Sequence, residues 1–187
     1  MSPPELDQPT DVADGTVPGV KHAAIRKLEH ELGIPPHQLP HDKFKFLTRF
    51  HYWAADTVTH GEKSPWGEHE IDYVLFFTIA NKQELNLDNP NREEVNGVKW
   101  VSQQSLLEMM DDSSLLFSPW FRIIVNKWVI GSNGWWNDLK TTMNTDTFCD
   151  YEGISRFDPP KEHLGGLGDA GLMFGDGDGD KAVGDAS

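Results

Sequence analysis

The fold is decided by a stretch near the N-terminus, residues 19–34, which reads GVKHAAIRKLEHELGI. Its apolar side chains recur every four positions from Val20 to Leu32, and charged side chains fill most of the other positions. A repeat close to 3.6 residues is typical of an amphipathic helix with one face on a protein core. Gly33 follows the last apolar position and two prolines come directly after Ile34, so we expect the helix to end at Leu32.

Downstream of this helix the pattern changes to the alternation that is typical of β-strands. Residues 43–54 alternate throughout, and residues 68–80 form a second candidate strand whose apolar centre, YVLFF, predicts burial on both faces. Residues 95–101 are predicted to form a third strand. Helices are then expected from Ser102, as N-cap, to about Met110, and over residues 120–130 after a Ser-Pro start.

Composition and charge limit the class of protein. The chain has 187 residues, of which 37% are hydrophobic, enough for one domain with a packed core. The formal charge of −14 argues against nucleic acid and anionic membranes as partners. The flanks supply −9 of it, so the central region, at −5, can still hold a small polyanionic ligand. We expect a linker over residues 1–18, one domain over 19–157, and a disordered acidic tail rich in Gly and Asp over 158–187.

Cysteine usage and the absence of targeting signals indicate a cytoplasmic protein. Cys149 is the sole cysteine, which excludes an intrachain disulfide framework and fits a reducing compartment. No apolar run is long enough to span a bilayer, and the N-terminus lacks the basic and apolar regions of a signal peptide.

Acidic side chains gather at the start of the second predicted strand, in residues 66–73, WGEHEIDY. Because side chains alternate along a strand, Glu68, Glu70 and Asp72 point to one face and His69 points to the other. Neighbouring carboxylates resist joint ionisation unless a cation bridges them or one keeps its proton, and both arrangements serve catalysis. An exposed acidic strand end is the alternative interpretation.

Residues 26–34, RKLEHELGI, resemble the helical half of a Nudix box, whose glutamates hold the magnesium ions that bind a diphosphate. Lys27 and His30 stand where that box has glutamates, so Glu31 is left as the metal-binding candidate. Taken alone, the same pattern fits a packed amphipathic helix without a ligand.

Taken together, these motifs are similar to one family. The Nudix-like helix, FLTRFHY (residues 46–52), WGEHEIDY, FSPWF (residues 117–121) and the pair Trp135-Trp136 follow the order found in eukaryotic, fungal-like type I isopentenyl-diphosphate delta-isomerases of the Nudix superfamily. The resemblance covers residues 19–156. It implies an α/β fold, a Nudix-type α/β/α sandwich with a mixed sheet, here without the family's N-terminal strands.

The resemblance also implies a reaction and its residues. The family isomerises isopentenyl diphosphate to dimethylallyl diphosphate by protonating the alkene and removing a proton from the carbocation, a step in isoprenoid biosynthesis. Glu70 matches the family's carboxylic acid, which protonates the alkene and also binds a metal ion. Glu68 matches a second ligand of the same metal ion. Tyr52 matches the tyrosine that hydrogen-bonds the acid, and Trp120 the tryptophan that contacts the substrate and steadies the cation. Read without the motif, Tyr52 and Trp120 fit ordinary core positions.

The implied cofactors are divalent cations. One Mg²⁺ arrives with the diphosphate and is held by Glu31, and Lys27 keeps positive charge near the phosphates. The second divalent site, for Mg²⁺, Mn²⁺ or Zn²⁺, has Glu68 and Glu70 as ligands and is incomplete in this chain. The implied partner is a small diphosphate substrate.

The chain also departs from the family pattern. The family's cysteine base and three metal-binding histidines belong to a segment upstream of the Nudix helix, and Cys149 lies in an unrelated context. We therefore expect a truncated member that is inactive alone, whereas the complete enzyme is a monomer and a fragment can self-associate through an exposed sheet edge. The alternatives are a non-catalytic Nudix fragment that acts as an interaction module and, less favoured, a Nudix diphosphohydrolase.

Overall fold

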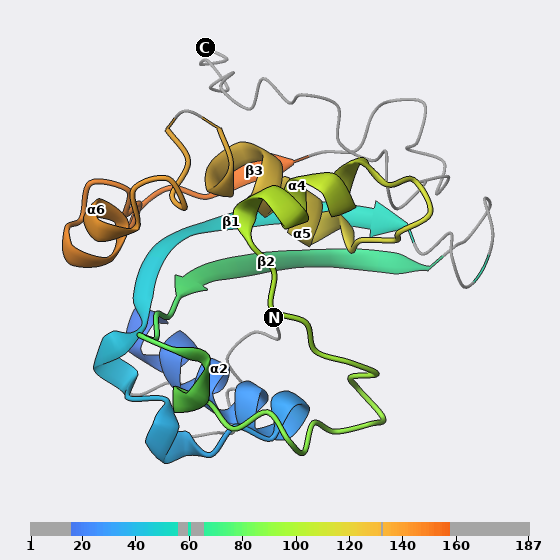
Figure 1. Cartoon of the computed structure of the whole chain (residues 1–187). Helices are drawn as coiled ribbons and strands as arrows, with labels where there is room; N and C mark the ends of the chain where they lie inside the picture. The colour runs from blue at the N-terminus through green and yellow to red at the C-terminus, as the bar shows by residue number, and fades with distance from the viewer. Residues whose placement is uncertain (1–15, 56–59, 61–65, 132, 158–187) are drawn as a thin grey trace, which may run out of the picture.

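A computed structural model describes residues 16–55, 60, 66–131 and 133–157, which form a mixed sheet with helices (Figure 1). In chain order the elements are α2 (Thr16–Leu32), η1 (Pro36–Gln38), η2 (His41–Lys43), β1 (Lys45–Ala55), β2 (Gly67–Phe76), η3 (Lys82–Glu84), α4 (Gln103–Asp111), α5 (Pro119–Ile124), η4 (Val125–Val129), α6 (Leu139–Asn144) and β3 (Ser155–Phe157). Helix α2 lies on one side of the β1–β2 pair, and α4 and α5 lie on the other (Figure 1). The α/β class predicted from the sequence is confirmed.

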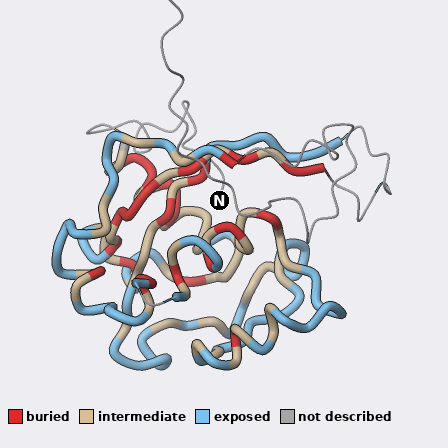
Figure 2. Tube along the Cα trace, turned by 90° about the horizontal axis from the view of Figure 1, so that it is seen from above, coloured by how far each residue is buried: buried red, intermediate tan, exposed pale blue. Residues whose placement is uncertain are grey.

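β1 is the central strand of the sheet, whose order is β2-β1-β3. It pairs with β2 in antiparallel register from Lys45 opposite Phe76 to Ala55 opposite Gly67, with an irregularity after Phe46. It pairs in parallel with the short β3, which makes the sheet mixed. Most residues of β1 are buried, with half-buried residues between them, whereas in β2 only Asp72 and Val74 are buried; Figure 2 shows burial along the chain.

Most of the predicted elements are present. Helix α2 ends at Leu32 as predicted and begins three residues before the predicted start, and β1 and β2 match the two alternating segments, with β2 ending at Phe76 rather than residue 80. The N-cap prediction at Ser102 is confirmed, because its hydroxyl accepts a hydrogen bond from Ser105 N at 3.1 Å. The predicted tail, and the predicted linker up to residue 15, lie outside the described residues.

Two expectations were wrong. Residues 95–101 form no strand, and Val98 and Trp100 in this segment are 46% and 53% exposed, because no described strand lies beside it to pair with. The centre of β2 is not buried on both faces, since Val74 is buried but Tyr73 and Leu75 are only half-buried. The helix predicted over residues 120–130 is present: Pro119 occupies its first position as expected, and from Val125 it continues as the π-helix η4, whose closing bond runs from Ile130 N to Val125 O.

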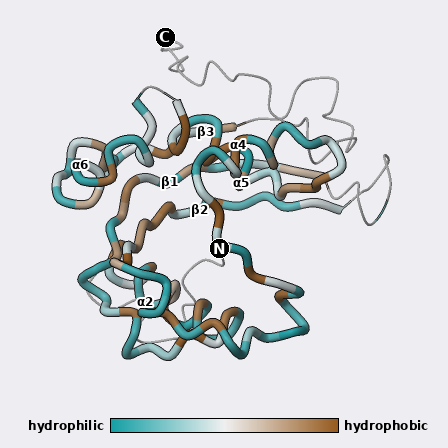
Figure 3. Tube along the Cα trace, viewed as in Figure 1, coloured by the Kyte–Doolittle hydropathy of each residue, from teal (hydrophilic) through white to brown (hydrophobic). Residues whose placement is uncertain are grey.

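The core has two parts, one on each side of the strands. The larger cluster joins the inner face of β1 to α5 and η4; its buried members are Leu47, Phe50, Tyr52, Ala54, Val74, Ile123, Val129, Trp135 and Phe157. The smaller joins α2 to the chain that follows it, through Ala24, Ile34, Leu39 and Phe44. Figure 3 shows that β2 is apolar toward its C-terminal end and polar toward its N-terminal end, so acidic side chains are left at the rim of the larger cluster.

No helix among the described residues is both long enough and apolar enough to cross a bilayer.

The end of α2 depends on a glycine. Gly33 has φ of +68°, and its N–H donates to Glu29 O at 2.9 Å. A Cβ at this position would lie 2.2 Å from Asn89 O, because the loop after η3 passes directly over the helix end. Asn91 N holds the same loop in place by donating to Glu31 O at 2.9 Å.

We expect Gly33→Ala to lower the free energy of unfolding by about 2–4 kcal/mol, because the new side chain meets both a left-handed backbone and a fixed carbonyl. Urea unfolding measures this change. Gly97→Ala is the matched control, since a Cβ there has nothing within 4 Å, and its effect should stay within about 0.5 kcal/mol. Equal losses in the two variants would contradict the role given to Gly33.

Candidate functional site

The β1–β2 register brings the predicted catalytic side chains to one face of the sheet. Tyr52 lies opposite Glu70, and the flanking pairs are Ala54 with Glu68 and Phe50 with Asp72. Directly opposed residues of an antiparallel pair point to the same side. The three acidic side chains therefore share the face that packs against α5 and η4, as the alternation in the sequence predicts.

Tyr52 and Glu68 form the closest contact at this site. The Tyr52 hydroxyl donates to Glu68 Oε2 at 2.5 Å. The predicted acceptor was Glu70, and that detail was wrong: a phenol has a single O–H, and here Glu68, the diagonal neighbour of Tyr52, receives it. Tyr52 is only 1% exposed, and burial, followed by the hydrogen bond and charge of Glu68, raises its pKa well above the usual range. Tyr52 is therefore a neutral donor throughout the physiological pH range.

Burial increases along β2 from the first acidic residue to the third. Glu68 and Glu70 are exposed, whereas Asp72 is only 3% exposed. Burial raises the pKa of Asp72 to about 6, and the negative charges of Glu70 and Glu68 act in the same direction. The inner end of the acidic row therefore takes up a proton at higher pH than an ordinary aspartate does, and the outer end is open to a ligand.

Trp120 lies in the first turn of α5, where Pro119 occupies the first helical position. Its ring is half-buried and packs against the larger cluster, which includes Tyr52. It meets Phe121 edge-to-face with 5.7 Å between ring centroids. Trp120, the ring predicted to stabilise the cation, and Tyr52 thus belong to the same packed region.

Lys27 and Glu31 form a separate group on α2. Lys27 Nζ lies 3.0 Å from Glu31 Oε1, an ion pair one helical turn apart. The apolar face of α2 packs in the smaller cluster. Within the described ranges, no group of three or more His, Cys, Asp or Glu side chains is placed to hold a metal ion. Glu31 therefore does not join Glu68 and Glu70 in a single three-carboxylate site.

The acidic pair fits a hydrated hard cation. Glu68 and Glu70 offer carboxylate oxygens from exposed positions on one face. Mg²⁺ prefers oxygen ligands and usually keeps several water molecules, so two carboxylates suffice to hold it. Zn²⁺ prefers His or Cys ligands to carboxylates alone, and no described His or Cys joins Glu68 and Glu70 to form a group of three.

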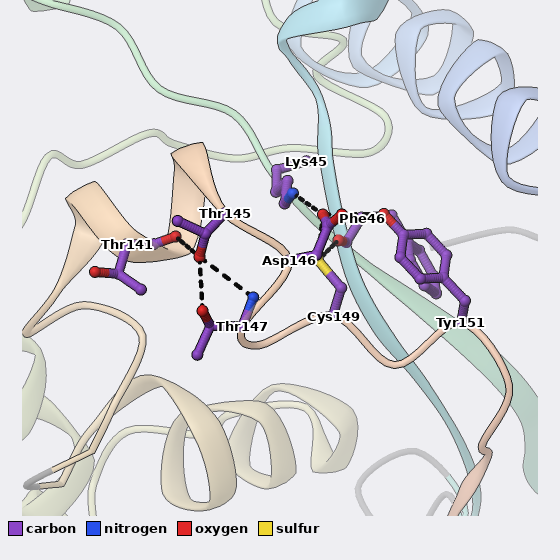
Figure 4. Close-up of polar contacts among 8 residues, drawn as sticks. All are labelled: Lys45, Phe46, Thr141, Thr145, Asp146, Thr147, Cys149 and Tyr151. Atoms are coloured by element: carbon purple, nitrogen blue, oxygen red, sulfur yellow. Dashed lines mark hydrogen bonds and ion pairs between the residues drawn. The ribbon is translucent and has the colours of Figure 1, made fainter.

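Cys149 lies at the other end of β1 (Figure 4). Its thiol donates to Phe46 O at 3.1 Å, next to the ion pair of Lys45 with Asp146 at 2.5 Å. Phe46 and Tyr52 are six positions apart on β1, which corresponds to about 20 Å at the rise of a strand. Burial also raises the pKa of the Cys149 thiol, so less of the thiolate that could accept a proton is present near neutral pH. Both observations favour the expectation that Cys149 is not the catalytic base.

His69 points to the opposite face of the sheet, as the alternation predicts, because it pairs with Trp53 rather than with Tyr52. The sequence did not indicate its partner there, which is His51 at an Nε2–Nε2 distance of 2.6 Å. The sequence does place His51 and His69 at odd positions of two neighbouring predicted strands. Whether the two side chains meet depends on the register between the strands, which the sequence alone does not give.

Comparison with known proteins agrees with the motifs. The model of the NUDIX domain matches residues 9–121. This chain is 43% identical to the isopentenyl-diphosphate delta-isomerase of Gibberella zeae over 131 residues, which are 70% of this chain and 46% of that protein. It is 48% identical to the isomerase of Schizosaccharomyces pombe over 123 residues, 66% of this chain and 48% of that protein. It is 33% identical to the isomerase of Bos taurus over 155 residues, 81% of this chain and 60% of that protein. The chain spans about half the length of the curated fungal relatives it matches. The resemblance stated from the motifs is confirmed, and because the domain model covers more than half of the sequence, the chain belongs to the Nudix family.

Proposed function

We propose that the chain carries the proton-donating side of an enzyme that isomerises isopentenyl diphosphate to dimethylallyl diphosphate. The observation that carries this proposal is the hydrogen bond from the buried Tyr52 hydroxyl to Glu68, beside Glu70 on one face of the β1–β2 pair. The names and similarity of the relatives supply the substrate.

The reaction needs one proton added and one removed. A proton goes to the terminal alkene carbon, a tertiary carbocation forms at the adjacent carbon, and a proton leaves the next carbon along the chain. We assign the first step to Glu70 as a carboxylic acid, because it is exposed on the shared face and can reach a ligand. Tyr52 holds Glu68 beside it through the 2.5 Å bond.

The carbocation needs a dry surface rich in π electrons. Trp120 is proposed for this role because its ring is half-buried at the start of α5 and belongs to the same packed region as Tyr52. The ring face of a tryptophan stabilises a desolvated cation by up to about 2 kcal/mol.

Divalent cations are proposed to bind at two places. Glu68 and Glu70 would hold one cation, and Glu31 would hold the Mg²⁺ that accompanies the diphosphate; a bound metal of this kind neutralises phosphate charge. Lys27 would contact the phosphates. In the described structure Lys27 is paired with Glu31, so the proposed phosphate contact lies beside the proposed Mg²⁺ ligand. Synthesis of isoprenoid precursors in the cytoplasm is the setting that we propose.

No described residue is assigned as the proton acceptor. The sequence has one cysteine, and Cys149 contacts the far end of β1. Among the residues that the structure describes, we find no thiol on the face of Glu70. We therefore propose that the 187 residues by themselves turn over isopentenyl diphosphate slowly or not at all.

The test is an isomerase assay of two proteins with added Mg²⁺: the 187-residue chain, and the same chain joined to the portion of the Schizosaccharomyces pombe relative that it does not match. We expect the joined protein to form dimethylallyl diphosphate at least about a hundredfold faster, since a positioned acid or base contributes 10²- to 10⁴-fold. A joined protein that folds but forms no product would contradict the proposal. Phosphate release by either protein would indicate diphosphate hydrolysis instead.

A further inference from the structure

Two histidines meet on the face of the β1–β2 pair that is turned away from the acidic site. In the register, His51 lies opposite Ile71 and His69 lies opposite Trp53, so the two are diagonal neighbours. Their Nε2 atoms are 2.6 Å apart, and the ring centroids are 4.6 Å apart at an angle of 44°. The rings thus converge through the nitrogens that can accept a proton or bind a metal.

The backbone that carries this pair is well fixed, while the rings stay accessible. The neighbours of His51 along β1, Phe50 and Tyr52, are at most 1% exposed, so the strand is anchored by the larger cluster. His51 is half-buried and His69 is exposed. A hydrated ion can therefore approach the rings without any change in the core.

The separation of the two nitrogens is close to what a metal ion requires. At 2.6 Å the rings share one proton between a donor and an acceptor nitrogen. A divalent ion bound about 2.0–2.1 Å from each nitrogen in tetrahedral geometry separates them by about 3.3 Å. Side-chain rotation that moves the nitrogens apart by less than about 1 Å makes that space, and the ion then replaces the shared proton.

We propose that His51 and His69 form a two-histidine site for a divalent transition-metal ion of the Zn²⁺, Ni²⁺ or Cu²⁺ class. Imidazole nitrogen suits these ions, whereas Mg²⁺ prefers oxygen. In the described part of the chain no third His, Cys, Asp or Glu completes a cluster here, so the described residues supply two ligands. This site differs from the acidic site in both face and ligand class, and it does not depend on the isomerase proposal.

Two arginines on the same face limit the affinity. Arg49 is two residues before His51 on β1, and its guanidinium donates to backbone carbonyls of residues 151–153 at 3.0–3.3 Å. Arg156 lies opposite His51 on β3. Both positive charges disfavour a dication. A metal that binds despite them joins β1 to β2 and stabilises the folded chain in proportion to its occupancy.

Titration calorimetry of the full 187-residue chain with Zn²⁺ and with Ni²⁺, after removal of bound metal, tests the site. We expect both ions to bind, and we expect His51→Gln and His69→Gln each to weaken the tightest binding step at least about tenfold. Because His69 is exposed, its replacement should leave the unfolding temperature without metal unchanged.

His41→Gln is the matched control. His41 also stacks with a second histidine, His22, at a centroid distance of 4.3 Å, but its Nε2 bonds to Pro18 O at 3.1 Å and is engaged. Metal binding should survive this replacement. Binding that is absent in the unmodified chain, that survives both His51→Gln and His69→Gln, or that is lost only in His41→Gln would overturn the proposal. Mg²⁺ should not raise the unfolding temperature through this pair.

Discussion

Glu70→Gln is expected to lower the kcat of the joined isomerase by at least about a thousandfold. An amide cannot supply the proton that the alkene needs, and positioned acids contribute 10²- to 10⁴-fold to such steps. The amide also lacks the negative charge that holds a cation beside Glu68. Because Glu70 is exposed, the replacement should not change the free energy of unfolding by more than about 0.5 kcal/mol. Steady-state kinetics at saturating Mg²⁺, with a urea unfolding curve for each variant, measures both quantities.

Two further variants make this prediction sharper. Glu94→Gln replaces another exposed glutamate, outside the strands, and should leave kcat unchanged. Glu68→Gln removes the charged acceptor of the Tyr52 hydroxyl, and the loss of activity should be smaller than for Glu70→Gln. A larger loss for Glu68→Gln would transfer the role of the acid to Glu68, and near-normal activity of Glu70→Gln would contradict the assignment altogether.

Phe50→Ala is expected to lower the free energy of unfolding by about 3–5 kcal/mol, the range for large aromatic residues removed from a core. Phe50 is 0% exposed, at the centre of the larger cluster. Its ring centroid lies 5.7 Å from those of Tyr52 and Trp128 and 5.9 Å from that of Phe157. Removing the ring therefore opens a cavity between β1, η4 and β3 that the neighbouring rings cannot readily fill.

Urea unfolding of the 187-residue chain measures this loss, and Trp100→Ala is the control. Trp100 is an aromatic residue of comparable size that is 53% exposed, outside both clusters. Its replacement should cost less than about 1 kcal/mol. Similar losses for the two variants would mean that the larger cluster is not the main source of stability.

The strongly periodic elements could be predicted because their pattern is set by local burial. The four-residue repeat of α2 and the alternation of β1 each record one face on a core. Residues 95–101 show a similar apolar pattern, yet a strand also needs a partner, and no described strand lies beside them. The short β3 was not predicted because three residues carry too little pattern and the strand depends on its pairing with β1.

The sequence predicted which side chains of the candidate site share one face of the sheet, but not which of them form hydrogen bonds with one another. Alternation placed Glu68, Glu70 and Asp72 together and His69 opposite them, and the register bears this out. The partner of Tyr52 could not be predicted in this way, because a tyrosine and a glutamate are long enough to meet diagonally across two strands. The metal-binding and catalytic roles of these residues stay predictions.

The measurement that tests the central claim most directly is the reaction of the joined protein with isopentenyl diphosphate in D₂O, followed by NMR of the product. A carboxyl group that exchanges with solvent and protonates the alkene must deliver deuterium to the terminal carbon. The account predicts dimethylallyl diphosphate with deuterium in its new methyl group, and none when Glu70 is replaced by Gln. Product without deuterium, or release of phosphate in place of isomerisation, would contradict it.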